Sequence, residues 1–172
     1  MGVFFQFDDV DAFTTAARGE PGQRVFYLQV RQGDTCVTVK CEKQQAAAIA
    51  DYLRKTMNDL PPPTSKPLPT SLELLDPDPV DTSFVLGPIG LGYDRENDRL
   101  LVQLEEIIPV DENGEPDEEA LDDRGKVRLL LERGQALAFC EHTEALVAAG
   151  RPPCTFCGRP MDPDGHPCPK MN

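Results

Sequence analysis

The chain of 172 residues contains no run of about 18 apolar residues, which is the length that a helix needs to cross a bilayer. Its first residues, MGVFFQFDDVDAF, have no basic stretch and reach an acid at Asp8, so they do not resemble a secretory signal. We therefore expect a cytoplasmic protein without a membrane segment.

Basic residues are also few, since 17 Lys and Arg stand against 30 Asp and Glu and give a net charge of −13. Proteins bind phosphate backbones and anionic lipid surfaces through Lys and Arg. The charge therefore argues against nucleic acid and against membranes as partners.

Histidine is nearly absent, and the sequence contains neither a G-x-S-x-G elbow nor a Walker loop. GPIGLG (87–92) has the glycines of a phosphate-binding loop, but no helix follows it, so we interpret it as a bulged strand. His142 falls on a predicted helix among polar residues, where we expect it to be exposed. The lack of a catalytic constellation favours a binding protein over an enzyme.

Six cysteines are present, but their distribution does not favour a disulfide scaffold. Without an export signal the thiols are expected to stay reduced. Cys36, Cys41 and Cys140 lie in segments with apolar periodicity, and we expect them in the core. The other three crowd together beside His166 at the end of the chain.

The most specific motif is CTFCGRPMDPDGHPCPK, residues 154–170. Cys154 and Cys157 form a C-x-x-C followed by glycine, which is typical of a metal-binding knuckle. His166 and Cys168 are two positions apart in an extended segment, so their side chains point the same way. The resulting Cys₃His set is closed and tetrahedral and suits structural Zn²⁺. Zinc binding would supply the folding energy that a small tail rich in proline and glycine lacks.

Three alternatives concern the same tail. The C-x-x-C pair could be a redox centre, although it follows Pro152 and Pro153 instead of a strand leading into a helix. The same ligands could hold iron. Cys140 or His142 could also replace His166 as the fourth ligand, although Cys140 falls on the buried stripe of a helix.

Hydrophobic periodicity predicts two halves with the same order of elements. The predicted strands span residues 3–7, 24–30, 35–40, 82–93, 100–108 and 126–131. The predicted helices span residues 42–57 and 132–150. Seven of the seventeen prolines lie between residues 61 and 79, so we place the internal boundary there.

The halves align at an offset of 90 positions, with VTVKCEKQQAAAIA (37–50) over VRLLLERGQALAFC (127–140). This predicts two pseudo-repeated βββα units joined by a proline-rich linker and followed by a zinc-knuckle tail. The units span residues 1–60 and 81–150, the linker 61–80 and the tail 151–172. Two amphipathic helices on a mostly antiparallel sheet would give an α+β fold with a two-layer core.

Both halves carry E-x-x-Q at the junction between the last strand and the helix, as Glu42 with Gln45 and as Glu132 with Gln135. An acid at this position caps free helix amides and interacts favourably with the helix dipole. The functional alternative is a pair of acids that face a shared cleft.

RGEPGQR (18–24) places Arg18 and Arg24 at the ends of a tight loop. The two side chains could bind an anion, or they could be solvated.

Residues 105–123 hold ten of the thirty acids and no base. We interpret this segment as an exposed, solvated loop. The alternative is a docking surface for a basic partner.

Three stretches resemble the DUF3090 family of uncharacterised, mainly actinobacterial proteins with a zinc-ribbon-like tail. They are GEPGQRVFYLQ (19–29), EKQQAAAIA (42–50) and AAGRPPCTFCGRPMDPDGHPCP (148–169). The resemblance implies no established activity. Its members are often described as accompanying a phosphatase- or phosphomutase-like protein and a kinase-like protein, which implies protein partners in a phosphate-linked pathway.

We therefore expect a zinc-binding, non-enzymatic adaptor that acts with protein partners. The alternative is an enzyme or ligand-binding regulator that handles a phosphate-containing small molecule in a cleft between the halves.

Overall fold

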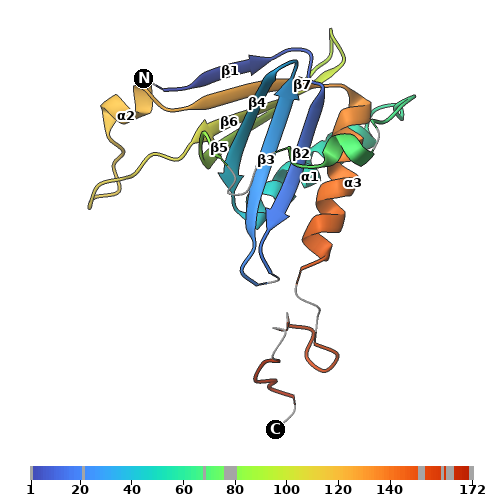
Figure 1. Cartoon of the computed structure of the whole chain (residues 1–172), viewed down its shortest axis with the longest axis vertical. Helices are drawn as coiled ribbons and strands as arrows, with labels where there is room; N and C mark the ends of the chain where they lie inside the picture. The colour runs from blue at the N-terminus through green and yellow to red at the C-terminus, as the bar shows by residue number, and fades with distance from the viewer. Residues whose placement is uncertain are drawn as a thin grey trace.

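The computed structural model describes residues 2–20, 22–67, 69–75, 81–150, 154–159, 161 and 165–170. Its seven strands form one sheet in the order β1-β7-β6-β5-β4-β3-β2 (Figure 1). The strands are β1 (Phe4–Phe7), β2 (Ala12–Arg18), β3 (Val25–Gln32), β4 (Thr35–Cys41), β5 (Phe84–Asp94), β6 (Arg99–Glu106) and β7 (Lys126–Leu131). The helices are α1 (Lys43–Asn58), α2 (Glu118–Asp122) and α3 (Arg133–Ala148), with a 3₁₀ turn, η1 (Pro69–Leu72).

The sheet is mixed. Strands β2, β3 and β4 form one antiparallel meander, and β5, β6 and β7 form another. Parallel pairing joins β4 to β5 and β1 to β7. The seven-stranded sheet packs with helices, which confirms the predicted α+β class. The predicted bulge in β5 is also confirmed, because its register with β6 shifts between Leu86 and Ile89.

The core lies between the long helices and the inner face of the sheet. Side chains from β2, β3, β4, β6 and β7 surround one small apolar space, so the sheet curls around the core. The ring of Phe13 on β2 stacks on Phe139 of α3, with centroids 4.4 Å apart. The predicted apolar stripe of α1 is confirmed, because its members are all buried: Ala46, Ile49, Ala50, Leu53 and Met57. No helix in the described ranges is long and apolar enough to cross a bilayer.

Helices α1 and α3 pack side by side and run in opposite directions. The ammonium of Lys43, in the first turn of α1, lies close to Gly150, just beyond the end of α3. At the other end, the guanidinium of Arg133 in the first turn of α3 donates to the carbonyl of Pro61, just beyond α1. Each helix therefore begins beside the end of the other.

Strand β2 was not predicted from the sequence. It lacks an alternating pattern because both of its faces are covered. On one face Thr15 hydrogen-bonds Thr143 of α3, and on the other Thr14 donates to the carbonyl of Leu72. The predicted strand at residues 3–7 exists as β1, but it pairs with β7 and does not join the first meander.

In the proline-rich linker, residues 61–66 lie against α3, and residues 71–75 lie on the outer face of β2 and β3. Arg31 donates to the carbonyl of Ser71, while the side-chain amide of Gln29 both donates to and accepts from the backbone of Leu75. Because side chains of β2 and β3 bind their backbone, residues 71–75 form a strap on the sheet and not a free spacer.

The three cysteines that were expected in the core differ from one another. Cys41 and Cys140 are buried, as predicted, and burial raises the pKa of each thiol to about 12. Cys36 is exposed, so its prediction was wrong. It lies on β4 in the face opposite Val37 and Val39, which both point into the core.

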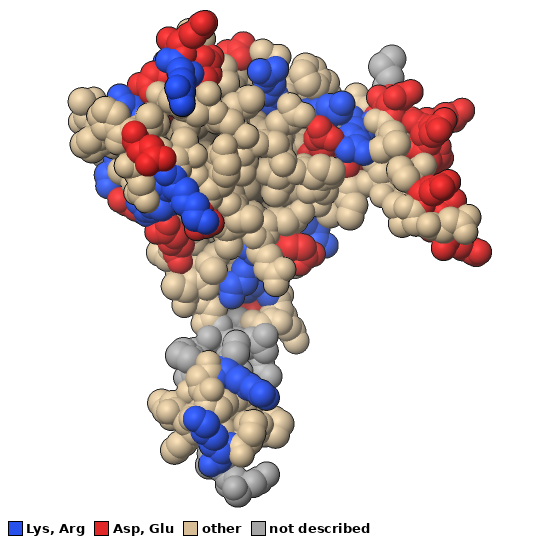
Figure 2. Space-filling view, turned by 180° about the vertical axis from the view of Figure 1, so that it is seen from behind, with Lys and Arg blue, Asp and Glu red and all other residues tan. Residues whose placement is uncertain are grey.

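The acidic segment projects from the body as an arm, seen in red at the right of Figure 2. We define the acidic arm as residues 107–123. Its side chains are mostly exposed, as predicted for residues 105–123, but Glu105 and Glu106 of the predicted loop belong to β6 and are half-buried. One carboxylate oxygen of Asp111 accepts the amides of Asn113 and Glu115, and this closes the tip of the arm.

Candidate metal centre

The metal centre that the sequence predicts lies in the tail, beyond the end of α3 (Figure 1). Its four ligand residues come from two short segments within residues 154–170. Among the described residues, the hydrogen bonds of these segments join tail atoms to other tail atoms. The tail is therefore organised by its own contacts.

The first segment, residues 154–159, forms a tight knuckle. The amide of Gly158 donates to the carbonyl of Cys154 at 2.8 Å, and the amide of Cys154 donates to the carbonyl of Arg159 at 2.8 Å. Gly158 has a φ of 73°, which an L-residue with a side chain rarely adopts. This turn brings the Cys154 and Cys157 sulfurs to the same side.

The amides of the knuckle also act on the Cys154 sulfur. The amides of Cys157 and Phe156 donate to it and lower the pKa of the Cys154 thiol to about 6. For Cys168 the amide of Lys170 acts in the same direction, but burial and the adjacent sulfurs outweigh it and raise the pKa of that thiol. A thiolate is the form that binds a metal, so the knuckle prepares Cys154 as a ligand.

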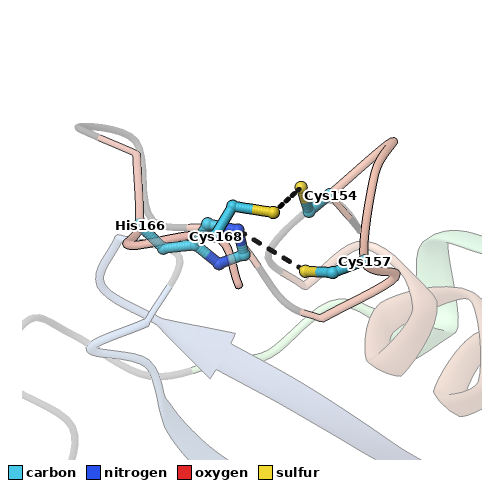
Figure 3. Close-up of side chains that lie close together, drawn as sticks. All are labelled: Cys154, Cys157, His166 and Cys168. Carbon is cyan, nitrogen blue, oxygen red and sulfur yellow. Dashed lines mark hydrogen bonds between the residues drawn. The ribbon is translucent and has the colours of Figure 1, made fainter. Parts of the chain in front are cut away.

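The four ligand atoms converge, as Figure 3 shows. The sulfurs of Cys154 and Cys168 are 3.9 Å apart, and the sulfur of Cys157 is 3.7 Å from Nε2 of His166. All four atoms lie within 4.8 Å of one another. Tetrahedral zinc implies edges of about 3.8 Å between sulfurs and about 3.6 Å between sulfur and nitrogen. The residues thus fit one tetrahedral ion with four protein ligands.

The alternative fourth ligands lie elsewhere. The Cys140 thiol donates to the carbonyl of Ala50 inside the core. Nε2 of His142 lies 2.8 Å from the carbonyl oxygen of Thr15. His142 is half-buried by this contact, which corrects the prediction that it is exposed. The C-x-x-C pair lies in a turn and does not begin a helix, which removes the geometry of a thioredoxin-like redox centre.

The E-x-x-Q residues begin the two long helices. Glu42 and Glu132 are the N-cap residues of α1 and α3, and each forms a capping box with its glutamine. The Gln45 amide also donates to the carbonyls of Leu86 and Gly87, and the Gln135 amide donates to that of Val10. Each glutamine therefore fastens a helix start to another segment of the fold.

The two arginines of the 18–24 loop have different surroundings. Arg18 is exposed at the end of β2. Arg24 donates to the carbonyls of Leu146 and of the C-cap residue Ala149 at the end of α3, at 3.4 and 3.2 Å. Arg24 and Glu42 line one cavity of about 350 Å³ together with Lys43. Sequence reasoning missed Lys43, although it directly follows Glu42 as Arg133 follows Glu132.

Glu132 lines a different and smaller cavity, of about 150 Å³, together with Arg99 and Arg133. The structure therefore places the two N-cap acids in separate hollows.

Comparison with known proteins gives one match. A family model described as "Protein of unknown function (DUF3090)" matches residues 5–168. Neither the curated proteins nor the solved structures gave a match. The matched region contains the sheet, except for Phe4 of β1, and all four Cys₃His residues. The chain therefore belongs to the DUF3090 family.

Proposed function

We propose that this chain is a zinc-binding protein whose ion is structural and that it acts as a non-enzymatic adaptor for protein partners. The observation that carries the zinc proposal is the convergence of four ligand atoms within 4.8 Å. Three sulfurs and one imidazole select zinc over harder ions such as Mg²⁺ or Ca²⁺. Four protein ligands leave no position for substrate or water, which supports a structural and not a catalytic ion.

The adaptor role draws on the acidic arm. The arm exposes two large apolar side chains, Ile107 and Val110, among its carboxylates. Acids around exposed apolar groups suit a partner with a basic, partly apolar surface. The family resemblance suggests phosphatase- or phosphomutase-like and kinase-like proteins as such partners.

Elemental analysis tests the zinc proposal. Protein purified without added metal should contain about one zinc per chain. Cys154→Ser should lose the metal, whereas Cys36→Ser, at an exposed cysteine outside the cluster, should keep it. Equal zinc content in Cys154→Ser and wild type would overturn the assignment.

Co-purification from the native cell tests the adaptor role. A variant with Asp117, Glu118, Glu119 and Asp122 changed to their amides keeps the shape of the arm and removes four charges. We expect it to lose the wild-type partner while it retains zinc. An identical set of partners for both proteins would exclude the arm as the docking surface.

The segment from β2 to α1 and the segment from β5 to α3 form two copies of one βββα unit in this proposal. Support comes from the register, because Phe26 pairs with Cys41 just before Glu42, and Leu100 pairs with Leu131 just before Glu132. Aligned family members should carry the Glu and Gln of the capping box at both junctions. Loss of the box from one junction in most members would argue against a repeat.

The second candidate function is the binding of a phosphate-containing small molecule between the halves. The cavity that contains Arg24, Glu42 and Lys43 favours it, because the first half supplies these side chains and Gly150 of the second half completes the lining.

A further inference from the structure

A cavity where α1 begins and α3 ends has more cations than carboxylates in its lining. We call this hollow the Arg24 cavity; its charged lining residues are Arg24, Glu42 and Lys43. Its volume of about 350 Å³ is within the range of about 300–1,000 Å³ that is typical of small-molecule sites. The cavity is therefore large enough for a small ligand.

The acid in the Arg24 cavity, Glu42, is the N-cap residue of α1. The carboxylate of Glu42 accepts a backbone amide of the first turn of α1 in the capping box. The two cations have no carboxylate partner among the described residues: Arg24 donates only to the carbonyls of Leu146 and Ala149, and no ion pair involves Lys43. Two cations and one carboxylate thus line this hollow, a formal charge of +1 in a chain with a net charge of −13.

The second half contains a natural comparison, the Glu132 cavity. Glu132 and Arg133 stand there at the positions that Glu42 and Lys43 occupy in the first half. Its two cations are both paired, Arg133 with Asp98 at 3.0 Å and Arg99 with Glu132 at 3.7 Å.

The two cavities differ at two aligned positions, because Arg24 and Val25 of the first half stand where the second half has Asp98 and Arg99. Arg24 stands two residues before Phe26, and Asp98 stands two residues before the equivalent Leu100. An arginine in the first half thus replaces the aspartate that neutralises the second. A helix with the same capping box begins at each cavity. The capping box alone therefore does not explain why the two cations of the Arg24 cavity have no carboxylate partner.

We propose that the Arg24 cavity binds a phosphate-bearing small molecule through Arg24 and Lys43. The carbonyls of α3 hold the guanidinium of Arg24 in place and leave further N–H donors for a ligand, since the group has five. A planar guanidinium and a lysine ammonium together match the geometry and charge of a phosphate dianion. This inference rests on the second candidate function and assigns its phosphate contacts to Arg24 and Lys43.

The test uses the zinc-loaded full chain labelled with ¹⁵N and titrated with inorganic phosphate at constant ionic strength. Amide signals of residues 22–26 and 42–45 should shift saturably, with a dissociation constant below about 10 mM. Signals of residues 132–135 serve as the internal reference and should not shift. Absence of saturable shifts near residues 42–45 would overturn the proposal.

Two variants assign the binding to the cavity. Lys43→Gln should weaken phosphate binding by about tenfold or more, because one charge-assisted contact is lost. Lys55→Gln removes a cation from the same helix outside the cavity and should leave binding unchanged. Equal weakening by both variants would mean that phosphate responds only to overall charge, and the proposal would fail.

Arg24→Gln separates ligand binding from the contact that Arg24 makes with α3. If Arg24 only caps that helix, the variant unfolds at a lower temperature but binds phosphate as the wild type does, and this result contradicts the proposal. Zinc content is measured in the same samples. Wild-type protein that binds phosphate but contains no zinc would refute the metal proposal alone, and zinc-loaded wild-type protein that does not bind phosphate would refute this inference alone.

Discussion

At the residue scale, cysteine has two opposite environments in this chain. Cys41 and Cys140 are buried among apolar side chains, which disfavours the thiolate. Cys154 is also little exposed, but backbone amides point at its sulfur and favour the thiolate. The surroundings of each sulfur, and not burial alone, decide which cysteines can bind a metal.

These environments predict which cysteines react with alkylating reagents. Burial raises the pKa of Cys41 and Cys140 to about 12, so at pH 8 almost none of either thiol is ionised. In the native, zinc-loaded protein, iodoacetamide should modify the exposed Cys36 first, and mass mapping of peptides identifies the site. Modification of Cys140 at the rate of Cys36 would contradict the packing described here.

Gly134 is a second position at which a single substitution should change the stability of the protein. A Cβ at this position would lie 2.0 Å from the carbonyl oxygen of Ser65, so the linker passes directly over the first turn of α3. Gly134→Ala should destabilise the protein by about 1–3 kcal/mol, measured by denaturant unfolding.

Gly90→Ala is the control for this substitution, because a Cβ there would meet Gln103 at an ordinary 3.4 Å. Equal stability of the two variants would mean that the linker does not lie over α3 in solution.

At the element scale, the start of each long helix is fastened by its glutamine. Gln45 accepts the amide of Glu42 at 2.8 Å and donates to β5, while Gln135 repeats the first contact and donates to Val10. These contacts give the E-x-x-Q motif a structural role at both helices. Glu42 and Glu132 are correspondingly engaged as caps.

Replacement of either glutamine tests this role. Gln45→Ala and Gln135→Ala should each lower the free energy of unfolding by about 1–2 kcal/mol, since each loses side-chain hydrogen bonds to backbone groups. Gln44→Ala, at an exposed neighbour, should change it little. A loss for Gln44→Ala as large as for Gln45→Ala would contradict the cap as the cause, because helix propensity alone favours alanine over glutamine.

The elements also show what the sequence could and could not predict. The stripe of α1 and the strands of the second half follow from periodicity, because each has one buried face. Strand β2 was not predicted because α3 covers one of its faces and the linker covers the other. Its sequence therefore does not alternate between apolar and polar residues. The pairing of β1 with β7 joins residues more than a hundred positions apart, and no local pattern specifies such a contact.

The metal site was predicted more completely than the fold. Ligand type and spacing are local properties of residues 154–168, and the four predicted ligands converge as expected. The Arg24 cavity was predicted only in part. Its lining joins β3, the start of α1 and Gly150, and such a meeting depends on the tertiary fold.

At the scale of the whole molecule, the chain consists of a sheet-and-helix core and a tail with its own organisation. The core buries the large apolar cluster, whereas the tail has few apolar side chains and depends on its ligand cluster. We therefore expect the two parts to lose structure independently.

Removal of the metal tests this independence. A chelator strong enough to remove zinc should make the tail sensitive to protease and leave the thermal unfolding midpoint of the core within about 2 °C of its value in the loaded protein. A large fall of the midpoint would show that the core and the tail form one cooperative unit.

X-ray absorption at the zinc edge tests whether Cys154, Cys157, His166 and Cys168 hold a single structural zinc ion. The spectrum should show three sulfur ligands at about 2.3 Å and one nitrogen ligand at about 2.0 Å, with no oxygen from water. Protein that contains no zinc, or zinc with an oxygen ligand in place of one of these four, would contradict this assignment.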